Sequence, residues 1–177
     1  MKKQISIILY IVFFSILLIF FYLLLAERDP SEIPSNLINR RVPSFEGDLL
    51  LKNKKFVSSD NFKDQITLVN FFATWCKPCR KEHEYINKLS DKKDIRIIGI
   101  NYKDNPKNTI KWINELGNPY SNIILDKNGR ISIDWGVYGI PETFVVSYNG
   151  IIKYRHVGAI NEKIYRKINL IIKDNKR

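Results

Sequence analysis

The sequence predicts an α/β domain, with a mixed central sheet flanked by helices, preceded by one transmembrane helix. Three observations support this prediction: an unbroken apolar segment near the N-terminus, an alternation of strand-like and helix-like segments after it, and an Asn-Gly hairpin signal near the C-terminus. Alternating strands and helices form βαβ units around parallel strands, and a tight hairpin adds antiparallel ones. At 177 residues, the chain suits one such domain, and we expect no second catalytic domain.

The apolar segment at residues 5–25 is uncharged, and a helix of its 21 residues would span about 30 Å, the thickness of bilayer hydrocarbon. A cleaved signal peptide is the alternative, but such peptides have apolar regions of about 7 to 15 residues and a small-residue cleavage site. We therefore expect a retained anchor. Because Lys2 and Lys3 precede the segment, residues 1–4 are expected in the cytoplasm and the bulk of the chain outside it.

The segment after the anchor, residues 26–41, is polar, contains Pro30 and Pro34, and lacks periodicity. These properties are typical of a linker, so the folded domain is expected at residues 42–177. Residues 42–51 predict an N-terminal extended segment or hairpin, which ends in a polar stretch.

Periodicity and turn residues define the later elements. Residues 66–73 form a nearly continuous apolar run, as expected of a central strand that is buried on both faces. The last helix is expected to place Ile164, Ile168 and Ile171 on one face. Further strands are predicted at 95–100, 122–125, 143–147 and 151–156, and helices at 76–89, 106–116, within 131–138, and at 161–173.

The net charge of +11 does not indicate nucleic-acid binding. Lysines and arginines are scattered among acidic residues, and no basic stripe with interleaved aromatic residues occurs. We expect a solvated basic surface, which could also assist encounters with acidic partners.

The two cysteines of the chain, Cys76 and Cys79, lie where the apolar strand gives way to a helix. A helix N-terminus stabilises a thiolate on the first cysteine, and the spacing lets the second close a disulfide, so the pair is typical of a redox dithiol. Cys76 is the predicted nucleophile, supported by the positive charges of Lys77 and Arg80, and Cys79 is the predicted resolving thiol.

Two other uses of the cysteines are less favoured. A structural bridge that closes so short a loop removes little chain entropy. A zinc site needs about four ligands, and the chain offers only two cysteines and two widely separated histidines. We therefore expect no metal and no cofactor other than the redox-active pair itself.

Glu82 lies on the same helical face as Cys79, so its side chain is expected to point into the core near the dithiol. A partly buried carboxylate there would resist ionisation and could exchange a proton with Cys79. The alternative is a surface glutamate that pairs with Lys81 or Arg80. His83 lies off this face and is expected to be solvated.

Three residues outside the helix complete the candidate site. Trp75 is either a lid over the substrate sulfur or a packing residue. In the loop at 136–144, Ile140-Pro141 is a candidate cis peptide that would expose backbone to an extended substrate, and an ordinary trans turn is the alternative. Glu142 supplies a second acid, whose distance from the cysteines the sequence leaves open.

Five motifs together closely resemble the CcmG/DsbE family of membrane-anchored, thioredoxin-like proteins of cytochrome c maturation. A W-C-x-x-C motif alone would indicate only the thioredoxin superfamily, whereas the fourth motif is much more specific. The likeness runs from about Val42 to near the C-terminus, and the anchor matches too. The motifs are T-W-C-K-P-C-R-K-E-H at 74–83, N-Y-K-D at 101–104, E-L-G-N-P-Y at 115–120, G-V-Y-G-I-P-E-T-F at 136–144 and Y-R-H-V-G at 154–158.

The resemblance implies a thioredoxin-like fold and a protein held by a single span in the bacterial inner membrane, with its C-terminal domain in the periplasm. The implied activity is reduction of the disulfide in apocytochrome c C-x-x-C-H motifs before haem attachment. The implied partners are apocytochrome c with the haem-ligation machinery, and a transmembrane thiol reductant of the DsbD/CcdA type that restores the dithiol.

Carried over by position, the resemblance makes Cys76 the attacking thiol, Cys79 the resolving thiol and Pro141 the cis-proline. Glu82 and Glu142 become the active-site acids. Asn70 stands six residues before Cys76, where general thioredoxins keep a buried aspartate, so either acid is a candidate for the proton role of that aspartate.

The residues alone leave the direction of electron flow open, because a dithiol oxidises or reduces according to its potential against its partners. Only the resemblance selects a reductant. The alternatives are a general periplasmic disulfide reductase or isomerase, a metal-binding chaperone that uses the C-x-x-C with a histidine, and a structural membrane-tethered module.

Overall fold

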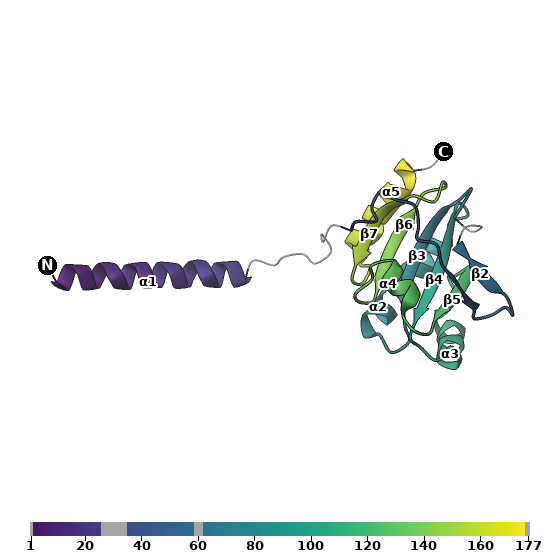
Figure 1. Cartoon of the computed structure of the whole chain (residues 1–177), viewed down its shortest axis with the longest axis horizontal. Helices are drawn as coiled ribbons and strands as arrows, with labels where there is room; N and C mark the ends of the chain where they lie inside the picture. Colours follow the sequence, from purple (N-terminus) through teal and green to yellow (C-terminus); the bar gives the residue numbers. More distant parts are fainter. Residues whose placement is uncertain (1, 26–34, 59–61, 176–177) are drawn as a thin grey trace. The chain divides into compact units, whose positions relative to one another are not determined.

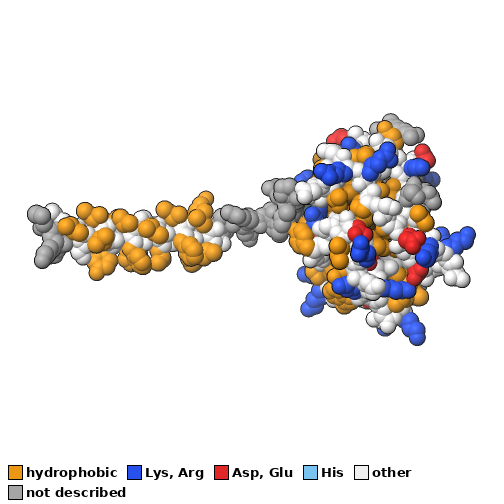
Figure 2. Space-filling view, viewed as in Figure 1, with side chains coloured by type: hydrophobic (Ala, Val, Ile, Leu, Met, Phe, Trp, Pro, Cys, Tyr) orange, Lys and Arg blue, Asp and Glu red, His pale blue; other side chains and the backbone are white. Residues whose placement is uncertain are grey.

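Residues 2–25, 35–58 and 62–175 are described by the structure, a computed structural model of the chain (Figure 1). They belong to two units, an N-terminal helix and an α/β unit. The helix, α1 (Lys2–Leu25), includes a stretch at Gln4–Leu24 that is long and apolar enough to cross a membrane. Hydrophobic side chains cover α1 along its length (Figure 2), and residues 4–24 are all exposed in the absence of lipid. By length and composition, α1 fits both an anchor and a signal sequence.

Within the described residues, a seven-stranded sheet forms the centre of the α/β unit, in the order β2-β1-β5-β4-β3-β6-β7. The middle strands, β5 (Asn122–Asp126), β4 (Ile95–Tyr102) and β3 (Ile66–Phe72), run parallel. Antiparallel strands flank them: β1 (Glu46–Leu49) with β2 (Lys55–Val57) on one side, and β6 (Glu142–Val146) with β7 (Ile152–Val157) on the other. The predicted mixed sheet is therefore confirmed.

Helices cover both faces of this sheet, and the side chains of β3 alternate between them. On one face, Leu68 and Phe72 pack with side chains of α2 (Lys77–Ser90), α3 (Pro106–Leu116) and α5 (Glu162–Asp174). On the other face, Val69 and Phe71 pack with Trp135 and with α4 (Arg130–Asp134). Burial of β3 on both faces explains its continuous apolar sequence, as predicted.

Helix α2 follows β3 directly and begins at the dithiol. Cys76 is the N-cap residue, and its Sγ accepts the backbone N–H of Cys79 at 3.2 Å. Pro78 lies in the first turn, where its missing N–H removes no helical hydrogen bond. The junction of a buried central strand with a capped helix therefore places both cysteines at one end of the sheet.

Two details differ from the sequence predictions. Residues 26–34 of the predicted linker lie outside the described residues, but residues 35–41 pack on the α/β unit. The N–H of Asn39 donates to the carbonyl of Ile152 at 2.8 Å, and the apolar Leu37 and Ile38 contact the core. In α5, Ile172 rather than Ile171 completes the fully buried face.

Candidate active site

Cys76 and Cys79 form a disulfide with an S–S distance of 2.05 Å. Both are buried, and Cys76 Sγ lies 3.7 Å from the carbonyl oxygen of Ile140. The following Ile140–Pro141 peptide bond is cis. Folding thus brings the loop before β6 against the sulfur of Cys76, although 64 residues separate Cys76 from Ile140 in the sequence.

The Glu82 carboxylate is buried beneath the dithiol, one helical turn after Cys79, with 1% of the residue exposed. Its Oε1 accepts a hydrogen bond from Nδ2 of Asn70 at 2.8 Å, and its Oε2 accepts one from the backbone N–H of Ile160 at 2.9 Å. Burial raises the pKa of Glu82 to about 7, although both hydrogen bonds act in the opposite direction. The structure therefore has Glu82 in the core rather than on the surface.

Asn70 connects Glu82 to two further buried side chains that were not among the predicted site residues. Its Oδ1 accepts the hydroxyl of Tyr120 at 2.9 Å, and its Nδ2 also donates to Oγ1 of Thr143 at 3.0 Å. The partners of Asn70 lie 12, 50 and 73 residues away in the chain, so no local pattern could have revealed them.

Glu142 is fully buried, but it does not join Glu82. Side chains alternate along β6, so Glu142 lies on the opposite face of the sheet from Thr143 and its partner Asn70. There its Oε2 accepts a hydrogen bond from Nε of Arg155 at 2.7 Å, and its Oε1 accepts one from the backbone N–H of Tyr138 at 3.3 Å. The two predicted acids therefore occupy separate environments.

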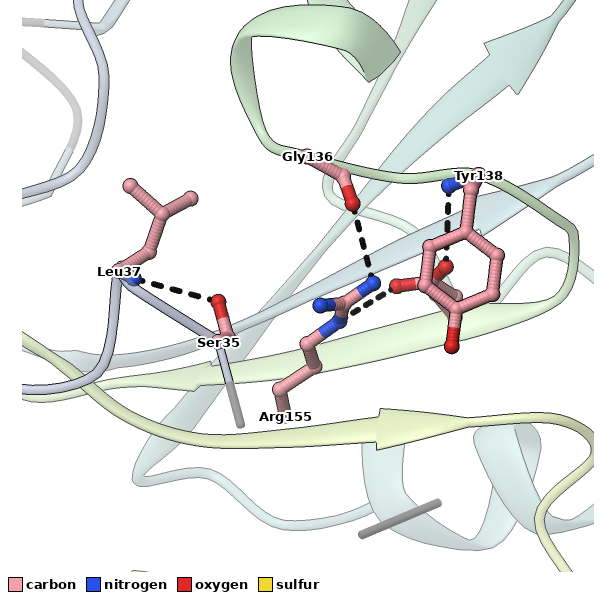
Figure 3. Close-up of polar contacts among 6 residues, drawn as sticks. Ser35, Leu37, Gly136, Tyr138 and Arg155 are labelled. Atoms are coloured by element: carbon pink, nitrogen blue, oxygen red, sulfur yellow. Dashed lines mark hydrogen bonds and ion pairs between the residues drawn. The ribbon is translucent and has the colours of Figure 1, made fainter. Parts of the chain in front are cut away.

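Arg155 holds the loop that carries the cis-proline. Besides its ion pair with Glu142, its Nη2 donates to the carbonyl of Gly136 at 3.0 Å (Figure 3). Its guanidinium also lies 5.1 Å from the centre of the Tyr138 ring. The sequence signal for this role was weak: one of three basic residues in the predicted strand, in a motif at 154–158 with no assigned function.

Trp75 remains 59% exposed beside the buried Cys76, so its ring is available at the surface rather than packed in the core. Its Nε1 donates to the carbonyl of Lys103 at 3.3 Å. The neighbouring Thr74 is held by Asp104, whose carboxylate accepts the Thr74 N–H at 2.6 Å and the Thr74 hydroxyl at 2.9 Å. The loop after β4 thus fixes the segment that leads into α2.

His83 is buried, so the prediction that it is solvated is wrong. Helix α3 covers this flank of α2: the indole N–H of Trp112 donates to Nδ1 of His83 at 3.2 Å, and Nε2 lies 3.0 Å from the carbonyl of Gly117. Because indole only donates, Nε2 carries the proton and donates to Gly117. Burial lowers the pKa of His83, which favours this neutral form.

Basic side chains near the dithiol lie at the surface. Lys77 is exposed, and the guanidinium of Arg80 lies 5.0 Å from the centre of the Trp112 ring and 3.9 Å from Glu115. Elsewhere the basic side chains are scattered over the visible face of the α/β unit (Figure 2). Among the described residues, no group of three or more His, Cys, Asp or Glu side chains is arranged to hold a metal.

Comparisons with known proteins agree with this fold and site. A family model described as Redoxin matches residues 38–168. The chain is 42% identical over 142 residues to the thiol:disulfide interchange protein DsbE of Vibrio cholerae, which covers 80% of this chain and 77% of that protein. It is 39% identical over 171 residues to DsbE of Escherichia coli K12, and this match covers 94% of this chain and 92% of that protein.

Solved structures show the same fold at lower sequence identity. A putative thiol:disulfide interchange protein DsbE from Chlorobium tepidum has a TM-score of 0.65 and 22% identity, and covers 77% of this chain and 96% of its own. A DsbF homologue from Corynebacterium diphtheriae has a TM-score of 0.68 and 18% identity, and covers 84% and 95%.

The fold and the C-x-x-C pair define a thioredoxin-like thiol–disulfide oxidoreductase. Within that class, the chain belongs to the DsbE/CcmG family of thiol:disulfide interchange proteins, as its five motifs predicted.

Proposed function

We propose that this protein is a periplasmic reductant, anchored in the bacterial inner membrane by α1, that reduces the disulfide of apocytochrome c C-x-x-C-H motifs during cytochrome c maturation. The observation that carries the proposal is the contact between the dithiol and the family-specific loop, where Cys76 Sγ lies 3.7 Å from the carbonyl of Ile140. Membership of the DsbE family supports the chemistry.

The reaction starts from the reduced dithiol. The thiolate of Cys76, at the N-terminus of α2, attacks one sulfur of the client disulfide, whose S–S bond breaks to leave a mixed disulfide. Cys79 then loses its proton and attacks Cys76 Sγ, so the bond between Cys76 and the client breaks. The two client sulfurs leave as thiolates and take up protons from water. Two electrons pass to the client, and the protein ends as the Cys76–Cys79 disulfide.

Glu82 takes up the proton that Cys79 loses. The two residues are three positions apart on α2, so their side chains share one face of the helix. A pKa of about 7 lets the carboxyl group accept a proton near neutral pH and release it again afterwards. Apart from the disulfide itself, the reaction needs no cofactor.

The client binds along the cis-proline loop in an extended conformation. The backbone around Ile140 is available to pair with it, and the exposed rings of Trp75 and Tyr138, at 59% and 61%, offer apolar contacts. After each turnover, a transmembrane thiol reductant of the DsbD/CcdA type restores the dithiol by the same exchange in the opposite sense.

Trapping of clients tests this proposal. The Cys79→Ala variant of the full chain cannot resolve the mixed disulfide, so its covalent partners can be isolated from cells and identified by mass spectrometry. The expected partners are apocytochromes c, linked through the cysteines of their C-x-x-C-H motifs. The matched control, Cys76→Ala combined with Cys79→Ala, should trap none.

A different partner set would overturn the assignment. A wide range of unrelated periplasmic proteins, without enrichment of apocytochromes c, would indicate a general disulfide reductase or isomerase.

A further inference from the structure

Four buried side chains form a polar cluster beneath the dithiol, which we call the Asn70 cluster: Asn70, Glu82, Tyr120 and Thr143. Asn70 and Thr143 are 0% exposed, Glu82 is 1% and Tyr120 is 6%. The members come from β3, α2, the segment before β5, and β6, so the cluster joins the helix of the dithiol to the sheet.

The observed hydrogen bonds suit an ionised Glu82. An ionised carboxylate only accepts, and both of its oxygens receive a donor, from Asn70 at 2.8 Å and from Ile160 at 2.9 Å. The amide of Asn70 is correspondingly oriented, with its Nδ2 toward Glu82 and Thr143 and its Oδ1 toward the Tyr120 hydroxyl.

A protonated Glu82 would make the same arrangement unfavourable. The new O–H needs an acceptor, but the groups that now face the carboxyl oxygens are N–H donors. A buried donor without a partner destabilises the state that contains it. The backbone of Ile160 cannot change its role, whereas the side-chain amide of Asn70 has an acceptor on its other side.

The remaining neighbours of Asn70 permit that amide to turn. Tyr120 and Thr143 present hydroxyl groups, which can each donate or accept. Burial, together with the charge of Glu82, raises the pKa of Tyr120 well above its usual range, so the hydroxyl keeps its proton at neutral pH. After a half-turn of the amide, Oδ1 would face Glu82 and Thr143, and Nδ2 would donate to the Tyr120 oxygen, whose own O–H would rotate away from Asn70.

We propose that Asn70 is a positioning residue that works as a proton-responsive switch: its side-chain amide turns over when Glu82 gains a proton and turns back when that proton leaves. The inference rests on the proposed role of Glu82 as proton acceptor for Cys79 and adds the device that lets a buried carboxyl serve in both states. An aspartate at position 70 could not do this, because a carboxylate has no N–H to offer to either Glu82 or Tyr120.

Other titratable groups surround the cluster and must be followed separately. Cys79 and His83 lie on α2 with Glu82, and His83 turns toward Trp112 of α3. On β7, His156 lies opposite Thr143 in the strand register. In the oxidised protein the cysteines do not titrate. A pH titration of the oxidised form therefore leaves Glu82 and the two histidines, which have distinct NMR signals.

NMR of the oxidised full-length chain in detergent micelles tests the switch. At high pH, the Nδ2 protons of Asn70 should show NOEs to Thr143. Through a midpoint near pH 7, these should be replaced by NOEs to the Tyr120 ring, in step with the Glu82 carboxyl carbon. If the carboxyl carbon titrates while the Thr143 NOEs persist at every pH, the switch does not exist.

A variant makes the test independent of where Glu82 titrates. Glu82→Gln mimics the protonated acid, because its amide can accept from Ile160 and donate to Asn70 at the same time. The Asn70 amide of this variant should contact Tyr120 at every pH. Persistent contact with Thr143 in this variant would refute the proposal.

Removal of the Tyr120 hydroxyl provides a second readout. Tyr120→Phe leaves Nδ2 of the turned amide without an acceptor, whereas in the observed orientation it leaves only Oδ1 without a donor. A buried N–H without a partner is less favourable than a buried oxygen without one, so the substitution disfavours the turned state. The midpoint for Glu82 should fall by about one pH unit. The matched control, Tyr85→Phe, removes a hydroxyl on α2 outside the Asn70 cluster and should leave the midpoint unchanged. An unchanged midpoint in Tyr120→Phe would contradict the switch.

These measurements need no client, so their failure and that of the proposed function are distinguishable. A fixed Asn70 amide together with trapped apocytochromes c removes only the switch. A turning amide without trapped apocytochromes c removes only the client assignment.

Discussion

Glu82 shows how burial and hydrogen bonding compete at a single residue. Desolvation favours the neutral acid, while the N–H groups of Asn70 and Ile160 favour the carboxylate. Desolvation prevails and raises the pKa from 4.5 to about 7. The group is therefore tuned to exchange protons near neutrality, and its ionisation costs the folded state stability.

This cost predicts how stability depends on pH. The folded state holds the Glu82 proton more tightly than the unfolded state, so the contribution of Glu82 to stability is fully present below pH 4.5 and is lost as the pH rises to about 7. The shift corresponds to about 3 kcal/mol. The Glu82→Gln variant has no carboxyl group to ionise at this position. The difference in unfolding free energy, variant minus natural protein, should therefore increase by about 3 kcal/mol between pH 4 and pH 8. Urea unfolding at both pH values measures it, and a constant difference would contradict a raised pKa.

Glu142 contrasts with Glu82 because a cation lies directly beside it. The side chains of Arg155 and Glu142 are 7% and 0% exposed, so Glu142→Ala would leave a buried, unpaired guanidinium. We expect a loss of about 3–5 kcal/mol in unfolding free energy, with the pH dependence of Cys76 alkylation unchanged. A variant of the exposed pair, Glu46→Ala beside Lys55, should cost less than about 1 kcal/mol. A stable Glu142→Ala variant with altered alkylation would instead restore Glu142 as a proton-transfer group.

At the scale of elements, the helices and strands were largely predictable from sequence. A nearly continuous apolar run predicted the buried β3, Pro106 and Gly117 bracket α3, and Asn149-Gly150 joins β6 to β7. The helical phase correctly predicted that Glu82 lies in the core, but it wrongly predicted that His83 is solvated. A helix wheel shows which face points at the sheet, whereas the burial of His83 depends on α3, which packs against the flank of α2.

The connection between β4 and α3 positions the segment that enters α2. The Asp104 carboxylate accepts four hydrogen bonds: from the N–H and hydroxyl of Thr74, from Nδ2 of Asn101 and from the N–H of Asn105. Asp104→Ala should therefore loosen the Trp75 segment and lower the rate of client reduction several-fold, at a cost of about 1–3 kcal/mol in stability.

Stopped-flow measurement of thiol–disulfide exchange would check the effect of Asp104→Ala. Asp48→Ala, which removes an exposed ion pair with Lys127, is the control for a lost carboxylate and should leave the rate unchanged. An Asp104→Ala variant with the natural exchange rate would show that this loop does not position the site.

At the scale of the whole molecule, the family and the thioredoxin-like fold were predictable because the motifs and the order of elements are local properties of the sequence. The polar network beneath the dithiol was not. Asn70 meets Thr143, and Glu82 meets Ile160, across 73 and 78 residues of sequence. The separation of Glu142 from Glu82 likewise depends on which face of the sheet the Glu142 side chain occupies. Strand periodicity alternates side chains between the two faces but does not say which face lies against α2.

The two units of the chain predict the result of truncation. The helix α1 and the α/β unit have separate internal contacts, so removal of the chain up to about Asp29 should leave a soluble domain that retains dithiol exchange. Solubility without detergent and the rate of insulin reduction would measure this outcome. Aggregation or loss of exchange after truncation would count against α1 as a simple anchor.

The reduction potential of the Cys76–Cys79 pair, measured in the full-length chain by equilibration with glutathione, decides most directly whether the protein is a reductant. A protein that reduces apocytochrome c must have a lower reduction potential than the disulfide of its client. We therefore expect a reducing potential, well below the value of about −120 mV that characterises a strong oxidant. A potential near about −120 mV would mean that the pair oxidises thiols and would contradict the proposed function.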